Sequence, residues 1–259
     1  MSGVIVIKTG GSMIDSLTDD FYKSIKQMQN LGYKPVIVHG GGPAINRILN
    51  GLKIESIFVN GLRKTTPEVM EVVEMVLSGQ ITNKLVRQLQ LHGMNAIGIN
   101  GADGGLLYAR ARDKENLGLV GEITQINHEL IEKLIELDFI PVISPIACGV
   151  DGEDCYNINA DTAAGEIAVS IHAEKLLFVT DVPGVLKDGD IIENTTKSEI
   201  LSLIDEGTIY GGMIPKVMAA IRGLEGGMSE SIIVSGMSPL IDGGTIIGTI
   251  IRKELEAVY

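Results

Sequence analysis

The sequence predicts an α/β fold with a mostly parallel central sheet, and three observations lead to that prediction. Short apolar runs alternate along the chain with amphipathic stretches of helical period. The apolar runs are continuous, which is typical of parallel strands that helices cover on both faces. No repeat, low-complexity tract or linker interrupts the 259 residues, so we expect both halves to share one sheet.

The expected elements follow one another in regular order. Strands are expected at six apolar runs, residues 4–7, 36–38, 96–99, 141–143, 176–179 and 231–234. Helices are expected at residues 15–31, 44–52, 129–137, 161–171 and 213–224, with another starting near Pro67. Short runs at residues 106–109 and 117–120, with Gly around them, predict hairpins near the mouth of a cleft. Parallel sheets bind ligands beyond the carboxyl ends of their strands, so functional residues are sought there.

Composition argues against several classes of protein. The net charge of −12 leaves no basic face for nucleic acid. No signal peptide is recognised, and no apolar run approaches the ~20 residues of a membrane helix. We therefore expect a cytoplasmic protein with Cys148 and Cys155 as reduced thiols, although a disulfide between them is possible in principle. The histidines show no metal-ligand spacing with each other or with the cysteines, and no Gly-x-Ser-x-Gly elbow occurs.

The first strand runs into Lys8-Thr9-Gly10-Gly11-Ser12, and an expected helix follows. Paired Gly before a helix start suits phosphate, because backbone N–H groups point outward and the helix dipole favours an anion. Lys8 at the strand end either needs a charged partner or extends its ammonium group into water, and both interpretations stay open. The pattern Gly-x-x-x-x-Gly-Lys-Ser/Thr is absent, so this is not a P-loop.

The second strand ends in His39-Gly40-Gly41-Gly42-Pro43, before another helix. Turn geometry needs one or two Gly, so three in a row favour close approach of a ligand to the backbone. The dinucleotide pattern Gly-x-Gly-x-x-Gly fails because Ile45 occupies the third Gly position. His39 is a candidate general base, but a structural histidine is the favoured interpretation.

Two further segments carry polar groups before expected helices. In Asn60-Gly61-Leu62-Arg63, the planar fork of Arg63 suits a carboxylate, although a solvated surface arginine is the commoner case. In Asn157-Ile158-Asn159-Ala160-Asp161, Asp161 is well placed as a helix N-cap. The two Asn add amide groups at the same helix mouth, where such a cluster can bind substrate.

The last segments lie in the C-terminal half. Thr180-Asp181-Val182-Pro183-Gly184-Val185 is either a turn or part of a nucleotide pocket. Gly211-Gly212-Met213-Ile214-Pro215-Lys216 opens a helix, with Pro215 suited to the first turn. A cation there opposes the helix dipole by ~0.3–1 kcal/mol, and Lys216 also falls near an apolar arc. Lys216 therefore needs an anion, most simply phosphate, unless its ammonium group extends into water.

Taken in order, these six motifs resemble the amino acid kinase family, and within it the members that phosphorylate N-acetyl-L-glutamate. They span almost the whole chain, and Thr9, where an aliphatic residue is more often expected, is a minor departure. The resemblance implies an αβα sandwich in a single domain. Its N-terminal lobe, about 1–174, would bind the acyl amino acid, and its C-terminal lobe, about 175–259, would bind MgATP. The γ-carboxylate would attack the γ-phosphorus and give an acyl phosphate, a step in arginine biosynthesis.

The resemblance also implies residue roles. Two lysines would neutralise charge on the transferring phosphoryl group, and one carboxylate would hold them in place: Lys8, Lys216 and Asp161. Backbone N–H groups of three glycines would bind phosphate oxygens: Gly10, Gly11 and Gly41. The acetylglutamate would be held by Gly41, Gly42, Arg63 and Asn157, and the nucleotide site lined by Asp181, Gly212 and Met213. Mg²⁺ would be coordinated mainly by the ATP phosphates, with few or no protein ligands. A carboxylate nucleophile is already ionised at pH 7, so no general base is required.

Two alternatives stay open. A sister kinase of the same fold could act on glutamate, acetylaminoadipate, carbamate or UMP. A catalytically silent ligand sensor is a different class, and the presence of both Lys8 and Lys216 argues against it.

The assembly is expected to be a homodimer that arginine does not inhibit. In residues 68–77, apolar side chains cover an arc wider than the ~100° stripe of a surface helix, which suggests burial against a symmetric partner. Some relatives implied by the resemblance are inhibited by arginine and carry an extra N-terminal helix. Only three residues precede the first expected strand here, so that helix is not expected.

Overall fold

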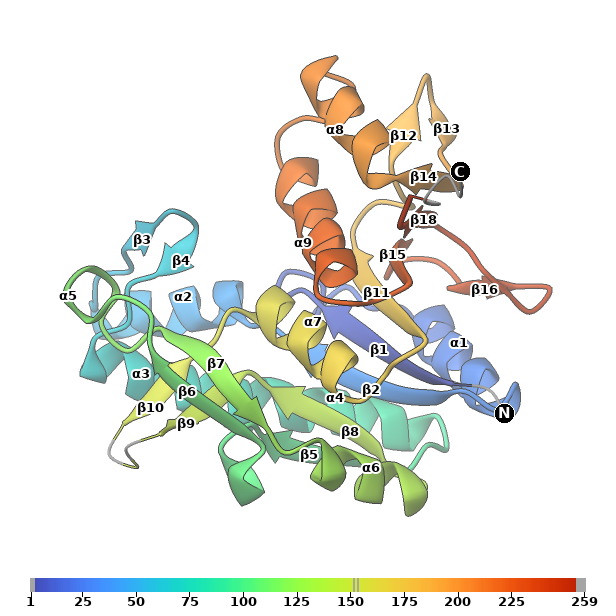
Figure 1. The fold of residues 1–259 in the computed structure, drawn as a ribbon. Coiled ribbons are helices and arrows are strands. Elements are labelled where there is room, and N and C mark those ends of the chain that lie inside the picture. The colour runs from blue at the N-terminus through green and yellow to red at the C-terminus, as the bar shows by residue number, and fades with distance from the viewer. Residues whose placement is uncertain (1–2, 151, 153, 255–259) are drawn as a thin grey trace. The chain divides into compact units, whose positions relative to one another are not determined.

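The computed structural model describes residues 3–150, 152 and 154–254, and it has the α/β fold that the sequence predicts, with a large, mostly parallel central sheet (Figure 1). The described residues pack into two compact units, the first within 1–8, 16–35 and 164–259 and the second within 9–15 and 36–163. This division follows packing. The boundary expected near residue 174 was instead based on which ligand each lobe would bind, and it stays a prediction.

The second unit contains two sheets and a small hairpin. Three parallel strands of the central sheet lie in the order β2-β8-β5, a four-stranded sheet has the order β10-β9-β6-β7, and β3 pairs with β4. The bounds are β2 (Lys34–His39), β3 (Phe58–Val59), β4 (Leu62–Arg63), β5 (Ala96–Asn100), β6 (Leu107–Ala111), β7 (Gly121–Ile126), β8 (Ile140–Ser144), β9 (Ile146–Gly149) and β10 (Cys155–Asn157). All five residues of β8 are buried, as expected of a central parallel strand.

Helices of the second unit cover these strands, with α4 against β5 and β8, and α6 against β8. The α-helices are α2 (Gly42–Leu52), α3 (Pro67–Glu74), α4 (Thr82–Leu91), α5 (Lys114–Leu117) and α6 (His128–Glu136). A π-helix, η1 (Met75–Ile81), joins α3 to α4, and η2 (Asp103–Gly105) is a short 3₁₀ turn. Thr66 caps α3 by accepting a hydrogen bond from the Val69 N–H, and Pro67 opens its first turn.

The first unit carries the rest of the central sheet, in the order β14-β18-β15-β11-β1. β11 and β15 are parallel, whereas β18 runs antiparallel to β15. The strands are β1 (Val4–Thr9), β11 (Lys175–Thr180), β12 (Leu186–Lys187), β13 (Asp190–Ile191), β14 (Asn194–Thr196), β15 (Glu230–Ser235), β16 (Ile241–Asp242), β17 (Thr245–Ile246) and β18 (Thr249–Arg252). The helices are α1 (Asp19–Asn30), α8 (Lys197–Asp205), α9 (Met213–Glu225) and most of α7 (Ala160–Ser170), whose residues 160–163 belong to the second unit.

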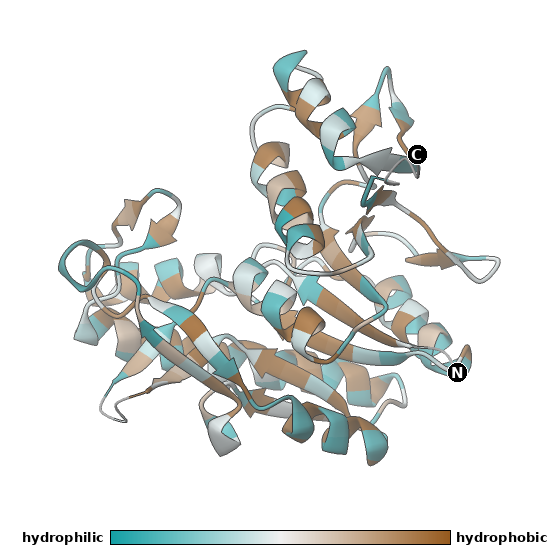
Figure 2. Ribbon diagram, viewed as in Figure 1, coloured by the Kyte–Doolittle hydropathy of each residue, from teal (hydrophilic) through white to brown (hydrophobic). Residues whose placement is uncertain are grey.

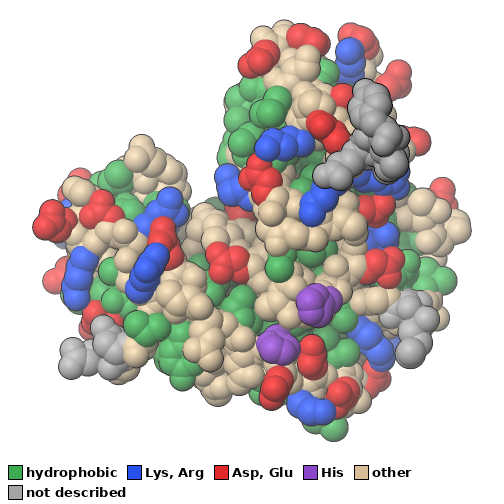
Figure 3. Space-filling model, viewed as in Figure 1, with side chains coloured by type: hydrophobic (Ala, Val, Ile, Leu, Met, Phe, Trp, Pro, Cys, Tyr) green, Lys and Arg blue, Asp and Glu red, His purple; other side chains and the backbone are tan. Residues whose placement is uncertain are grey.

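Hydropathy explains why these elements form. The central strands are apolar along most of their length, whereas the helices carry apolar and polar sides (Figure 2). All six expected strands lie inside observed ones. On the face in Figure 3, Lys and Arg side chains lie among Asp and Glu side chains rather than apart from them.

Two expected elements were wrong in position. The first helix begins at Asp19 rather than residue 15, because Thr18 caps it and accepts a hydrogen bond from the Phe21 N–H. Its start therefore lies eight residues after Gly11, and the dipole of that helix does not follow the first Gly loop directly. The strand expected at residues 117–120 is also displaced: Leu117 ends a short helix that Asp113 caps, and β7 begins at Gly121.

The apolar arc at residues 68–77 is covered within this chain. Its six apolar side chains are all at most 4% exposed: Val69, Met70, Val72, Val73, Val76 and Leu77. Part of the segment is a π-helix, which a projection at 100° per residue does not describe. The chain's own packing covers this helix, so the homodimer stays a prediction without support from it. None of the helices in the described part of the chain is long and apolar enough to cross a membrane.

Candidate active site

Two glycine loops of the second unit touch through their backbones. The Gly40 N–H donates to the carbonyl oxygen of Thr9 at 2.9 Å. A Cβ placed on Gly11 would lie 2.7 Å from the Cα and N of Gly41, and 2.7 Å from the N of Gly42. Gly11 is therefore required by a backbone contact between residues about thirty positions apart, and not by a turn.

Gly41 is enclosed from its other side by the π-helix. A Cβ there would meet the side-chain ends of Leu77 and Ile81 at 2.4 and 2.6 Å. His39 fastens the same loop: Nδ1 lies 3.2 Å from the Gly40 carbonyl oxygen, and Nε2 lies 2.7 Å from the Thr82 hydroxyl oxygen. Burial lowers the pKa of His39 from 6.5 to about 4. A neutral ring with both nitrogens engaged fits the structural interpretation of this histidine.

The second glycine loop leads directly into α2. Gly41 is the N-cap and has no side chain to cap the helix, and Pro43 occupies the first turn. Among the described residues, this helix start therefore has no side-chain cap for its N–H groups. Unsatisfied N–H groups and the positive end of a helix dipole favour an anion.

Arg63 lies opposite Phe58 in the β3–β4 hairpin. Asn60 and Gly61 form the turn with φ of 50° and 79°, the left-handed conformation that an Asn-Gly turn adopts readily. The guanidinium carbon of Arg63 lies 4.7 Å from the centre of the Phe58 ring, a cation–π contact. The hairpin thus fixes the direction in which the arginine extends.

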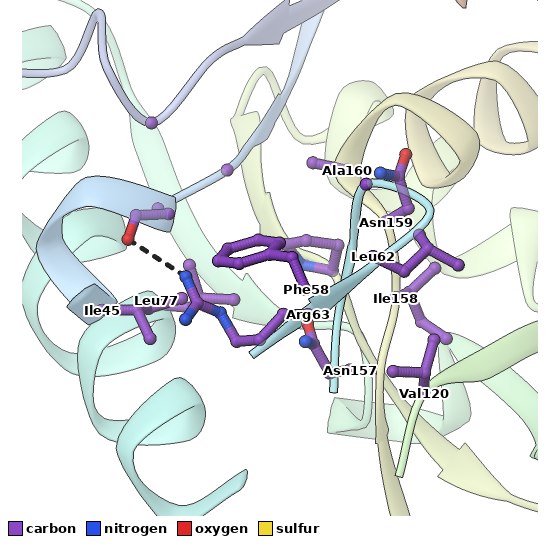
Figure 4. Close-up of a pocket in the computed structure, with 16 residues that line it drawn as sticks. Ile45, Phe58, Leu62, Arg63, Leu77, Val120, Asn157, Ile158, Asn159 and Ala160 are labelled. Carbon is purple, nitrogen blue, oxygen red and sulfur yellow. Dashed lines mark hydrogen bonds between the residues drawn. The ribbon is translucent and has the colours of Figure 1, made fainter. Parts of the chain in front are cut away.

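The guanidinium of Arg63 is buried without a carboxylate. The residue is 7% exposed, and burial lowers its pKa. It donates to the Ser56 hydroxyl and, at 3.3 Å, to the Gly42 carbonyl oxygen (Figure 4). No carboxylate among the described residues forms a salt bridge with it. The surface arginine considered from the sequence is therefore wrong, and a buried cation with unused donors favours a bound anion.

A third segment completes this side of the site. Asn157 ends β10, and its side-chain amide donates to the Thr65 hydroxyl at 3.1 Å. Asn159, rather than Asp161, caps α7: its Oδ1 accepts from the N–H groups of Asp161 and Thr162, both at 3.0 Å. The N-cap role expected for Asp161 is therefore wrong, and Asp161 lies in the first turn of α7.

These segments line one pocket of about 180 Å³ within the second unit. Glycine backbone and Arg63 bound part of it, while Leu62, Val120 and Ile158 gather on the other side of the hairpin (Figure 4). Five of the expected site residues line it: Gly11, Gly41, Gly42, Arg63 and Asn157. Gly10 is one residue outside, where its carbonyl oxygen accepts from the Met13 N–H at 2.9 Å.

Sequence reasoning missed several lining residues, above all Phe58, Leu62, Val120 and Ile158. A signal for Phe58 was present. Asn-Gly flanked by apolar residues predicts a tight hairpin, and its register places Phe58 opposite Arg63. Val120 and Ile158 carried no local signal.

The first unit holds a separate polar cluster around Lys216, in the first turns of α9. Its ammonium group donates to the Thr180 hydroxyl and the Asp181 carboxylate, just after β11. Hydrogen bonds from Lys216 and then Thr180 lower the pKa of Asp181. Lys216 thus has the anion that its position requires, although that anion is a carboxylate of the chain.

The other expected residues of the first unit lie at the ends of elements. Gly212 precedes α9 as its N-cap without a side-chain cap, and Met213 is the first helical residue. Lys8 is the fifth residue of β1 and is only partly exposed. Asp161 belongs to the second unit, so its expected role of holding the lysines stays a prediction.

Similarity to known proteins identifies the family. The sequence profile of the amino acid kinase family matches residues 3–235. The chain belongs to the amino acid kinase family. Among its relatives, the acetylglutamate kinase of Halalkalibacterium halodurans is 51% identical over 237 residues, 91% of this chain and 90% of the relative. The acetylglutamate kinase of Geobacillus thermodenitrificans is 50% identical over 257 residues, 99% of each chain.

A solved structure shows the same fold as this amino acid kinase. It is the crystal structure of smu.665 from Streptococcus mutans UA159, which is 33% identical and has a TM-score of 0.84. The match covers 97% of this chain and 99% of that one. The two glycine loops, the β3–β4 hairpin and α9 all lie within the residues that the family profile matches.

Proposed function

We propose that this chain acts as an acetylglutamate kinase. It transfers the γ-phosphoryl group of ATP to the γ-carboxylate of N-acetyl-L-glutamate and makes an acyl phosphate for arginine biosynthesis. Two relatives that carry this name and are 50–51% identical over most of both chains support the proposal. Membership of the amino acid kinase family implies the use of ATP.

The observation that carries the substrate assignment is the buried, carboxylate-free guanidinium of Arg63. In this proposal its fork binds the carboxylate of acetylglutamate that does not react, since planar bidentate pairing is the strongest contact between these groups. Asn157, Gly41 and Gly42 supply further polar contacts. The apolar side of the pocket suits the uncharged part of the substrate, including its acetyl methyl group.

Phosphoryl transfer needs positioning and charge stabilisation more than covalent help from the protein. The γ-carboxylate is ionised at pH 7 and attacks without a general base. In this proposal Gly10, Gly11 and Gly41 donate backbone N–H groups to phosphate oxygens. Lys8 and Lys216 offset the developing charge, and Asp161 positions these lysines. The nucleotide contacts Asp181, Gly212 and Met213.

In this proposal Mg²⁺ binds together with ATP. Among the described residues, no three His, Cys, Asp or Glu side chains gather as a metal site. In this proposal the phosphates carry the metal, because Mg²⁺ keeps several waters and needs few protein ligands. When bound, it neutralises phosphate charge.

A coupled ADP-release assay against a panel of acceptors tests the function. Acetylglutamate should be the best acceptor, ahead of glutamate, acetylaminoadipate and carbamate. A preference for acetylaminoadipate would assign the chain to a sister activity. Calorimetric binding of ATP without turnover of any acceptor would favour the silent sensor.

We also propose a cytoplasmic homodimer that arginine does not inhibit. Sedimentation with and without arginine tests the assembly, and an activity titration in parallel tests inhibition. A hexamer, or inhibition at sub-millimolar arginine, would contradict this part of the proposal.

A further inference from the structure

Cys148 and Cys155 face each other across two strands of the second unit. β9 and β10 are antiparallel, and their register pairs Cys155 with Cys148. The next pair along, Gly149 and Asp154, is joined by a hydrogen bond of 2.7 Å from the Gly149 N–H to the Asp154 carbonyl oxygen. Hydrogen-bonded and non-hydrogen-bonded pairs alternate along such a ladder, so the cysteines form a non-hydrogen-bonded pair.

This kind of pair suits a disulfide. In non-hydrogen-bonded pairs the Cα atoms are about 4.5 Å apart and the two side chains stand close together on one face. Disulfides need Cα atoms about 4.4–6.8 Å apart with Cβ atoms directed at each other. Both cysteines are free thiols and only partly buried, so a small oxidant can reach them.

The surroundings favour a thiol pair over a metal site. Within the part of the chain that the structure describes, no third ligand completes a metal-binding group with the two sulfurs. The Cys148 thiol donates to the Ala102 carbonyl oxygen at 3.6 Å. Burial raises the pKa of the Cys155 thiol, and the negative charge of Glu74 raises it further. A raised pKa leaves a smaller fraction of the Cys155 thiol ionised at neutral pH.

We propose that Cys148 and Cys155 form a reversible dithiol–disulfide site that low-molecular-weight disulfides oxidise. The Cys148 thiolate attacks one sulfur of glutathione disulfide, forms a mixed disulfide and releases one glutathione thiolate. The Cys155 thiolate then attacks the Cys148 sulfur and releases the second glutathione. Two electrons pass from the cysteines to glutathione disulfide, and the two protons that the cysteines lose protonate the departing thiolates.

The strand that carries this site also carries a pocket residue. Asn157 lies two positions after Cys155 on β10, so their side chains share a face of the sheet. Asn157 lines the pocket and donates to Thr65. The disulfide would fix the pairing of β9 and β10 beside the pocket. The proposal stands apart from the kinase activity, since it rests on the hairpin alone.

Mass spectrometry of the full chain tests the site. The native protein is equilibrated with mixtures of reduced and oxidised glutathione. Its free thiols are then alkylated, and the mass of the intact chain is measured. We expect wild-type protein to lose both thiols together and to retain no glutathione. Cys148→Ser and Cys155→Ser are the matched controls, and each should carry at most one glutathione. Two unmodified thiols, two glutathiones per wild-type chain, or a disulfide between chains would overturn the proposal.

Thermal unfolding of the same wild-type protein provides a readout that needs no variant. A disulfide that closes a short loop without strain should raise Tm by about 5 °C in the oxidised form. A lower Tm after oxidation would mean that the bond distorts the hairpin, and would overturn the inference that the pair is already aligned.

Discussion

The substitution Gly11→Ala tests the contact between the two glycine loops. Its Cβ would lie 2.7 Å from three backbone atoms of Gly41 and Gly42, and backbone cannot rotate away as a side chain can. Ordinary contact begins at 3.4 Å, so one loop must retreat by about 0.7 Å. The start of α2 would move with it.

The displacement of the loop should have two measurable effects, one on stability and one on the rate. Overpacking a close contact costs typically ~1–3 kcal/mol of stability, which corresponds to a fall in Tm of roughly 2–12 °C for a chain of this size class. A misplacement near 1 Å in a phosphoryl-transfer site can cost about 10²-fold in rate. We therefore expect kcat/KM to fall by ~10–100-fold.

The assay pairs urea unfolding with steady-state kinetics on acetylglutamate and ATP. Gly51→Ala is the matched control, because it lies in α2, outside the pocket, and its added Cβ meets nothing within 4 Å. Its stability should stay equal or rise by ~0.4–1 kcal/mol. Gly42→Ala also meets nothing within 4 Å, and its stability should remain within ~0.5 kcal/mol of wild type. A Gly11→Ala variant as stable and active as Gly51→Ala would refute the reasoning.

Three further predictions concern single side chains. Lys8→Ala or Lys216→Ala should each lower kcat by ~10²–10³ while the fold survives, and an unchanged kcat in folded Lys216→Ala would remove that lysine from the mechanism. Arg63→Lys should raise KM for the acyl amino acid far more than KM for ATP, because an ammonium group lacks the planar fork; equal increases would give Arg63 another role. His39 has a folded pKa of about 4 against 6.5 when unfolded, so its contribution to stability is complete above about pH 6.5. That contribution should decline by about 3 kcal/mol as the pH falls towards 4, and urea titrations should show a slope that His39→Gln lacks.

Local patterns predicted the framework of this protein well. Continuous apolar runs predicted six strands of the central sheet, because parallel strands that are covered on both faces, such as β8, are apolar on both sides. The limits of helices were less certain, since several polar residues near a start can each serve as the cap. Thr18 caps α1 and Asn159 caps α7, and the backbone geometry of each turn made the choice.

The surroundings of Arg63 were beyond a local pattern. An isolated arginine after a turn is usually solvated, and only the hairpin that folds it onto Phe58 and Gly42 buries it. The Asn-Gly turn is a short-range signal for that hairpin. The contact with Gly42, 21 positions away, has no such signal.

The sequence by itself determined the α/β fold class, the order of strands and helices, and the family. These follow from local periodicity and from motifs in a set order, and both can be recognised from consecutive residues of the sequence. Only the tertiary structure decided which distant residues meet: Gly11 against Gly41, Lys216 with Asp181, and Cys148 opposite Cys155. Such contacts depend on strand register and on how helices pack, which one stretch of sequence does not specify because many segments compete to bury the same apolar surface.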